Sequence, residues 1–545
     1  MKYFLLSLLL VGMIATNCFS QCNTSNSFAY LNVNNINATI DNAGMLFSTL
    51  VNGKAYTAGY EAPKGGGVNS MFTAGLWIGG IDPGKQLHLA ASTYRQNGND
   101  YSVGPYNYTG SFNFDTVWAV YKSTIDSFRA GQFSTIPKVI KYWPAQGNPY
   151  LQNLPNQSLA PFVDVNSNGV YDPANGDYPD IRGDEATWEI FNDGCTPHNE
   201  SFNSAPLNIE VQILAYAFND TGYLSNTAFY RYTITNKASV AYDSTFIGLF
   251  ADPDIGCYLD DYIGCDSALN MGIAYNGEAI DGGNGTVCAS SYPNYGDHPP
   301  LLGVQMVNLP VNKNGDTIRM ANFMWYNNDT TEIGNPARTI DYYHYMQAIW
   351  RDSTHLTKYG NGHGGSIKCN YAFPSDPTDT TTGAWSKCHD SLASIHDFMG
   401  DVRFLMDFGS FTFKAGDVIN FTYDMLFYHD TTTFIYPCPS FSYLTNMADS
   451  VKATNVTGIN NVEKNNLQLT FYPNPMDDAG TFSFKPNTVK EIKLFNILGQ
   501  QVRDLRAISS STSVQLQRGN LTAGIYFYSA TTTNGIISNG KIVIQ

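Results

Sequence analysis

The sequence predicts a mainly β protein made of antiparallel β-sandwich domains, with a small β-sandwich domain at its C-terminal end. Only 14% of the residues are charged, while 14% are aromatic and 36 are tyrosines, a composition that favours strands. Apolar residues alternate with polar ones in segments 208–218 and 418–428, a period typical of half-buried strands. Loops rich in Asn, Gly, Asp, Pro and Thr separate such segments and favour turns. Together these features indicate packed antiparallel sheets.

The length of the chain indicates more than one domain. A chain of 545 residues exceeds what one hydrophobic core usually supports. Residues 1–20 resemble a signal peptide, because Lys2 precedes an apolar run and small residues precede Gln21. We expect two sandwich-like domains in residues 21–449, a polar linker at 450–468 and a small β domain at 469–545.

Two segments have helical rather than alternating patterns. They are residues 117–130 and 341–352, and in each the aromatic side chains share one face. We interpret these faces as core packing.

The charge balance argues against nucleic acid as a partner. The chain carries 46 acidic and 30 basic residues, a formal net charge of -16, so it repels a phosphate backbone. After the signal peptide, no apolar run approaches the roughly 20 residues that span a bilayer, so we expect no transmembrane segment.

The cysteines predict disulfides. Cleavage after Ser20 would remove Cys18 and leave eight of the nine cysteines, and an even number in an exported chain favours disulfide bonds. The sequence does not select the full pairing, although Cys257 with Cys265 is the pair we expect locally. The alternative is that some cysteines remain buried thiols.

Residues 164–177 have the spacing of a calcium-binding loop. Such a loop takes oxygen ligands at positions 1, 3, 5, 7 and 9, with glycine at position 6; counted from Asp164, Gly169 stands sixth. Position 12 is Asn175, which cannot act as a bidentate carboxylate, so Asp177, or else Asp180 or Asp184, must complete the site. The predicted Ca²⁺ ligands are Asp164, Asn166, Asn168, the carbonyl of Val170, Asp172 and Asp177.

We expect calcium in this loop to be structural and weakly bound, since the site has few carboxylates. The alternative interpretation is a solvent-facing turn closed by Asx hydrogen bonds.

A second acidic cluster lies in residues 252–266. Five aspartates in so short a stretch repel one another unless a cation or solvent screens them. A second cation site and an exposed acidic loop both fit this pattern. The aspartates are Asp252, Asp254, Asp260, Asp261 and Asp266.

The C-terminal segment carries four motifs in a fixed order. They are Tyr472-Pro473-Asn474-Pro475, Leu494-Phe495-Asn496 with Leu498-Gly499-Gln500, Leu521 with Gly524-Ile525-Tyr526, and Lys541-Ile542-Val543. With them the segment resembles the C-terminal sorting domain of type IX secretion in Bacteroidota. The resemblance implies recognition by the type IX secretion machinery, passage through the outer membrane, and surface attachment or release.

The middle of the chain resembles uncharacterised surface proteins that carry the same tail. The similar segments are 74–82, the Asp164 loop with Trp188, 251–266 and 401–417. This resemblance implies a shared extracellular scaffold and no particular activity.

The sequence predicts no catalytic residues. His363 lies among glycines in residues 360–366, but no GxSxG, HExxH or P-loop motif accompanies it. We therefore predict an exported surface or released protein with a structural, adhesive or glycan- or protein-binding role. The alternative is a secreted hydrolase acting on polysaccharide or protein, in which acidic side chains or His363 meet only in three dimensions.

Overall fold

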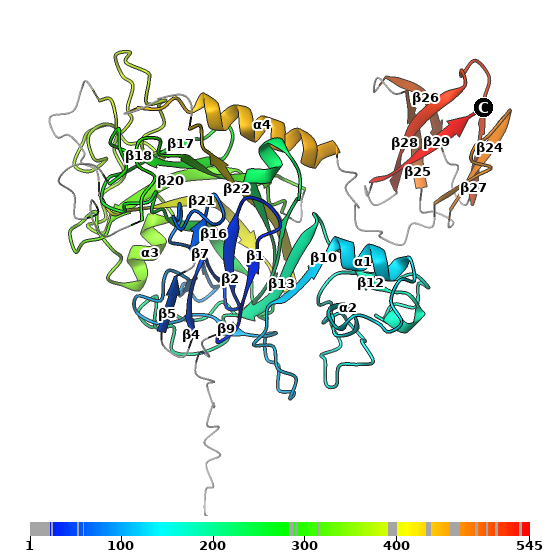
Figure 1. The fold of residues 1–545 in the computed structure, drawn as a ribbon, viewed down its shortest axis with the longest axis horizontal. Helices are drawn as coiled ribbons and strands as arrows, with labels where there is room; N and C mark the ends of the chain where they lie inside the picture. Colours follow the sequence, from blue (N-terminus) through cyan, green and yellow to red (C-terminus); the bar gives the residue numbers. More distant parts are fainter. Residues whose placement is uncertain are drawn as a thin grey trace, which may run out of the picture. The chain divides into compact units, whose positions relative to one another are not determined.

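The computed structural model confirms a mainly β protein, with 40% of residues in strands and 8% in helices (Figure 1). The chain divides into two compact units, Met1–Lys452 and Ala453–Gln545. The structure describes residues 22, 25–51, 54–57, 59–282, 288, 293–312, 315–390, 400–431, 438–457, 469–484, 489–496, 500–506, 511–532 and 537–545. The predicted signal peptide, residues 1–20, lies outside them. The number of domains within residues 21–449 stays a prediction.

The first unit contains two large sheets of nine strands each, with all strand pairs antiparallel. The first sheet runs in the order β1 (Phe28–Leu31), β2 (Asn37–Asp41), β3 (Met45–Leu46), β7 (Thr73–Ile81), β16 (Tyr242–Asp252), β21 (Val402–Phe413) and β20 (Met320–Asn327), with β6 (Tyr60–Glu61) beside β2 and β8 (Leu87–Ala91) beside β7.

The second sheet begins at β10 and ends at β17. Its order is β10 (Trp118–Tyr121), β13 (Glu185–Asn192), β14 (Ile209–Ala217), β15 (Thr227–Asn236), β22 (Val418–Tyr428), β19 (Leu301–Asn308), β18 (Met271–Asn276) and β17 (Asp261–Asp266), with β9 (Ser102–Val103) beside β13. Two short hairpins complete the strands of this unit, β4 (Ser48–Val51) with β5 (Lys54–Thr57) and β11 (Phe162–Val163) with β12 (Tyr178–Pro179).

The two sheets share one hydrophobic core, and a second core covers the other face of the second sheet. In β14, Val211 and Ile213 belong to the shared core with Trp77 of the first sheet, whereas Leu214 and Tyr216 belong to the second core. The predicted strands at 208–218 and 418–428 are confirmed. The half-buried expectation holds at the start of β22, where exposed Val418 and Asn420 alternate with buried Ile419 and Phe421, but it is wrong for β14. Because alternate side chains enter two different cores, both faces of β14 are buried.

Short helices lie among the strands. They are α1 (Lys122–Arg129), α2 (Lys138–Lys141), α3 (Thr339–Tyr345) and α4 (Ser442–Thr457), with single 3₁₀ turns η1 (Pro173–Asn175) and η2 (Gly222–Asn226). Leu444, Met447 and Val451 of α4 pack in the second core.

Both predicted helices are shorter than expected. The first begins only at Lys122, because residues 118–121 pair with β13 as a strand, as their aromatic and β-branched side chains favour. The second ends at Tyr345, and three residues later Ala348 adopts a φ of 55°, which a helix cannot accommodate. Tyr342 and Tyr345 lie in the shared core, as the core-packing interpretation requires.

The predicted linker at 450–468 begins inside α4, which continues to Thr457. Residues 458–468 lie outside the described part of the chain.

Three disulfides confirm the prediction from the cysteine count: Cys22–Cys195, Cys257–Cys288 and Cys388–Cys438. The expected pair Cys257–Cys265 is wrong. Cys265 is a buried thiol in β17, where the sheet directs its Sγ to the carbonyl of Ala372 at 3.4 Å, and Cys257 reaches Cys288 instead.

The second unit is a small β domain with two antiparallel sheets. One consists of β23 (Thr470–Tyr472), β24 (Ala479–Ser483) and β27 (Ser513–Gln517); the other runs in the order β26 (Gln501–Arg506), β25 (Val489–Phe495), β28 (Gly524–Thr532) and β29 (Ile537–Ile544). Side chains from both sheets, among them Phe482, Ile492 and Ile542, form one core.

Candidate metal sites and the sorting domain

The predicted calcium loop is the hairpin loop between β11 and β12. Phe162 pairs with Pro179 and Val163 with Tyr178. Residues 164–177 therefore leave the end of β11 and enter β12 at neighbouring points. Tyr171 anchors the loop in the second core, and its hydroxyl donates a hydrogen bond to the carbonyl of Ile140 at 2.6 Å.

Asp177 fastens the two ends of the loop. It is buried, and its Oδ1 accepts a hydrogen bond from the N–H of Val165 at 2.8 Å while Oδ2 accepts one from the N–H of Asp172 at 2.7 Å. Asp177 is a predicted ligand because position 12 of the loop lacks a carboxylate, and the structure places Asp177 against the loop.

The side chains at positions 1, 3 and 5 organise the tip of the loop. Asp164 Oδ2 accepts a hydrogen bond from the N–H of Gly169 at 2.7 Å. Asn166 and Asn168 accept hydrogen bonds from the N–H groups of Asn168 and Val170 at 3.1 and 2.9 Å. Gly169 has a φ of +82°, which glycine adopts readily.

Asp172 is held by local contacts. Its carboxylate accepts hydrogen bonds from the N–H of Ala174 at 3.1 Å and from the amide of Asn175 at 2.6 Å. The six predicted ligands therefore share one hairpin loop, and their binding of calcium stays a prediction.

The second acidic cluster includes a residue from outside 252–266, Asp401. One carboxylate oxygen from each of Asp252, Asp254 and Asp401 lies within 4.8 Å of the other two, close enough to hold a metal ion. Asp252 ends β16 and Asp401 immediately precedes β21. These strands pair antiparallel, so the sheet brings together residues that are far apart in sequence.

Arg403 lies between two of these carboxylates. Its Nε is 3.1 Å from Asp252 Oδ1 and its terminal nitrogen is 2.7 Å from Asp401 Oδ1. Burial raises the pKa of Asp252 to about 7, although Arg403 acts to lower it. Burial and the neighbouring Asp252 also raise the pKa of Asp254 well above its usual range.

The cluster is not an exposed acidic loop. Asp252, Asp260 and Asp261 are buried, and Asp260 accepts hydrogen bonds from the amide of Asn276 at 3.0 Å and the N–H of Gly282 at 2.9 Å. Asp266, the fifth predicted member, is the last residue of β17 and accepts a hydrogen bond from the N–H of Ala268 at 2.9 Å.

His363 forms a pair with an acidic residue. Its Nε2 lies 2.8 Å from Asp352 Oδ2, and its ring contacts Trp350 edge-to-face. His363 entered the hydrolase alternative predicted from the sequence, whereas no sequence pattern linked Asp352 to this histidine.

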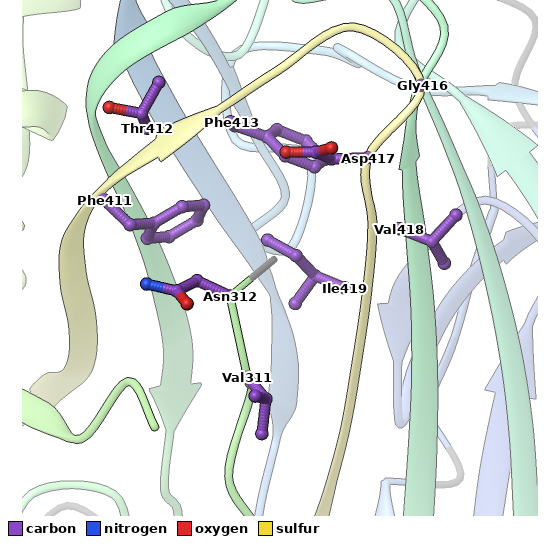
Figure 2. Close-up of a pocket in the computed structure, with 9 residues that line it drawn as sticks. All are labelled: Val311, Asn312, Phe411, Thr412, Phe413, Gly416, Asp417, Val418 and Ile419. Carbon is purple, nitrogen blue, oxygen red and sulfur yellow. The ribbon is translucent and has the colours of Figure 1, made fainter. Parts of the chain in front are cut away.

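A small pocket of about 230 Å³ lies at the turn between β21 and β22 (Figure 2). Most of its wall is apolar, and Asp417 is its acidic residue. The lining residues are Val311, Asn312, Phe411, Thr412, Phe413, Gly416, Asp417, Val418 and Ile419.

In the C-terminal unit, Asn474 connects the first motif to the last strand. Its Nδ2 donates to the carbonyl of Lys541 at 3.0 Å, and its Oδ1 accepts from the N–H of Val543 at 2.8 Å. Tyr472, by contrast, is 80% exposed. The first and fourth motifs therefore meet in space, whereas Leu498 and Gly499 of the second lie outside the described residues.

Residues 470–545 match the family model described as the secretion system C-terminal sorting domain. This segment is a type IX secretion sorting domain. The sorting domain indicates secretion to the cell surface or exterior, and it implies recognition by the type IX secretion system. In the described part of the chain, no helix combines the length and apolar character that crossing a membrane would require.

The other comparisons with known proteins carry little information beyond the sorting domain. A search of curated proteins finds no match. A polysaccharide lyase is similar at 10% identity and a TM-score of 0.17, over 62% of this chain and 34% of the lyase. CopC from Methylosinus trichosporium OB3b is similar at 16% identity and a TM-score of 0.11, over 13% of this chain and 78% of CopC. At these scores neither likeness carries an argument about activity.

Proposed function

We propose that the sorting domain delivers a calcium-stabilised β-sandwich protein whose role outside the cell is structural, adhesive or ligand-binding. The observation that carries this proposal is the sorting domain at residues 470–545, attached to a unit with three disulfides. Disulfides suit an oxidising extracellular location.

The proposed calcium ligands are those of the hairpin loop at 164–177. Their oxygen donors are of the kind that calcium takes in proteins, and the carboxylate of Asp177 replaces the missing acid at position 12. Calcium would neutralise Asp164, Asp172 and Asp177, which otherwise repel one another in a short loop.

A ligand-binding role is supported by aromatic side chains next to this hairpin. Tyr142 and Tyr150 are exposed, and the Lys141 ammonium lies 4.6 Å from the centre of the Tyr150 ring. The carbonyl of Gln146 in the same segment accepts a hydrogen bond from the N–H of Tyr171 at 2.8 Å. Flat rings with a polar tip suit sugars and protein surfaces, so the calcium loop would hold a binding surface in place.

Thermal unfolding tests the calcium proposal. We expect the wild-type protein to unfold at a higher midpoint temperature in millimolar calcium than in chelator. At a calcium concentration of ten times Kd, binding at one site should add about 1.4 kcal/mol to the free energy of unfolding. The Asp164→Ala, Asp172→Ala double variant should lose the part of this shift that comes from calcium in the loop at 164–177. The matched control is Asp220→Ala, an exposed aspartate between β14 and η2, which should respond to calcium like the wild type. An equal calcium shift in the double variant would contradict the proposal.

The alternative, a secreted hydrolase, draws on the His363–Asp352 pair, because a carboxylate can orient a histidine that acts as a base. If the protein hydrolyses a polysaccharide or protein substrate through this pair, His363→Ala should lower the rate by about 10²–10⁴-fold. His355→Ala is the control, since His355 bonds to a backbone carbonyl instead. Hydrolysis that survives His363→Ala would exclude this pair from catalysis.

A further inference from the structure

The negative charge at the ends of β16 and β21 is only partly neutralised by the surrounding side chains. Three carboxylates meet there, from Asp252, Asp254 and Asp401, and Arg403 forms ion pairs with two of them. When all four groups are ionised, their net charge is −2, so a divalent cation would balance it.

Two buried carboxylates at this place have oxygens without hydrogen bonds. Asp252 is 1% exposed, and among the described residues neither of its oxygens accepts a hydrogen bond, although Oδ1 has the ion pair with Arg403. Asp261 is also buried and its Oδ1 has no hydrogen-bond partner in that part of the chain. Leaving such oxygens unsatisfied is costly, and a cation would satisfy them.

The positions of these oxygens are fixed by the surrounding backbone. Asp261 Oδ2 accepts a hydrogen bond from the N–H of Ile255 at 3.1 Å, which holds its carboxylate beside the peptide that follows Asp254. The N–H of Gly256 donates to the carbonyl of Asn69 at 3.0 Å, and the next residue, Cys257, is in a disulfide. The loop is thus held in place both by the segment between β6 and β7 and by the disulfide.

We propose that Asp252, Asp254 and Asp401 bind a divalent cation of the calcium class, with Asp261 beside it. All the donors of this triad are carboxylate oxygens, which suit hard cations such as Ca²⁺ and Mg²⁺ and do not favour zinc. This second site is independent of the calcium proposed in the loop at 164–177.

The number of calcium ions bound per protein tests the proposal. It is measured by equilibrium dialysis of the whole purified protein against calcium chloride. We expect Asp254→Asn to weaken one binding event by about tenfold or more, which is at least the loss seen when groups supporting a metal ligand are changed. The Asp164→Ala, Asp172→Ala double variant should retain that event, so failure at one site is distinguishable from failure at the other. Asp243→Asn, an exposed aspartate of the same strand β16, is the matched control.

A second measurement separates cation binding from a merely structural role. In chelator, Asp254→Asn should unfold at or above the wild-type midpoint, because it removes one of the mutually repelling charges. Asp401→Asn, measured in parallel, should also lose the binding event. In the wild type, calcium should slow hydrogen exchange of the amides in residues 252–261. Unchanged calcium binding in both variants, or no change in exchange, would overturn the proposal.

Discussion

Removal of residues 470–545 should abolish delivery of the protein to the cell surface or exterior. These residues form the sorting domain, with a core of its own that includes Phe482, Ile492 and Ile542. Because Met1–Lys452 forms a separate compact unit, its folding should not require them. Surface labelling and immunoblotting of the culture medium would measure the loss in the natural host.

The control for this deletion is the full-length Asp164→Ala, Asp172→Ala variant, whose sorting domain is unchanged. It should reach the surface or medium even if its first unit is less stable. Normal delivery of the truncated chain would show that residues 470–545 are not needed for export in this protein.

Asp407→Asn should make the protein more stable than the wild type at neutral pH. Asp407 is buried in β21 and neither of its oxygens has a hydrogen-bond partner among the described residues. Burial raises the pKa of this carboxyl well above its usual range. An asparagine has the same shape and cannot ionise, so the variant avoids the free energy of keeping a proton on a buried carboxyl where the unfolded chain has lost it, about 1.4 kcal/mol for each pH unit.

The direction of the pH dependence follows from the raised pKa. In the unfolded chain an aspartate loses its proton near pH 4, whereas the folded protein keeps the proton on Asp407 to higher pH. The contribution of Asp407 to stability is therefore fully present below about pH 4 and is lost as pH rises through the folded pKa. The stability of Asp407→Asn lacks this contribution to the pH dependence, because an amide does not ionise.

Urea unfolding at several pH values between about 4 and 8 measures the difference. The wild type and Asp407→Asn should have similar midpoints at the acid end and diverge as pH rises. Asp316→Asn, an exposed aspartate, controls for the loss of a surface charge. If the midpoints of Asp407→Asn and the wild type differ by the same amount at every pH, the substitution acts through packing rather than through the proton on Asp407.

The surroundings of Asp407 explain why it fits in the core at all. Gly248 in the neighbouring strand leaves room for it, since a Cβ there would lie 2.8 Å from Asp407 Oδ1. Asn322, its partner across β20 and β21, has a buried amide oxygen without a hydrogen bond in the described part of the chain. A protonated Asp407 can donate a hydrogen bond, which an ionised carboxylate cannot.

The sequence alone determined the features that depend on neighbouring residues. The alternation in 208–218 and 418–428 predicted two strands, because side chains in a strand point to opposite faces in turn. The motifs from Tyr472 to Val543 predicted the sorting domain, because they occur in order within one short segment. The spacing from Asp164 to Asp172 predicted a loop, and residues 164–177 do form one, between β11 and β12.

Only the tertiary structure decided what depends on distant segments. The partner of Cys257 is Cys288 rather than Cys265, because β17 directs Cys265 into the core. The triad needs Asp401, which pairing of β16 with β21 brings to Asp252 across nearly 150 intervening residues. The burial of both faces of β14 came from a second core. Strand pairing and sheet packing connect residues without regard to their separation in sequence, so a local pattern carries no record of them.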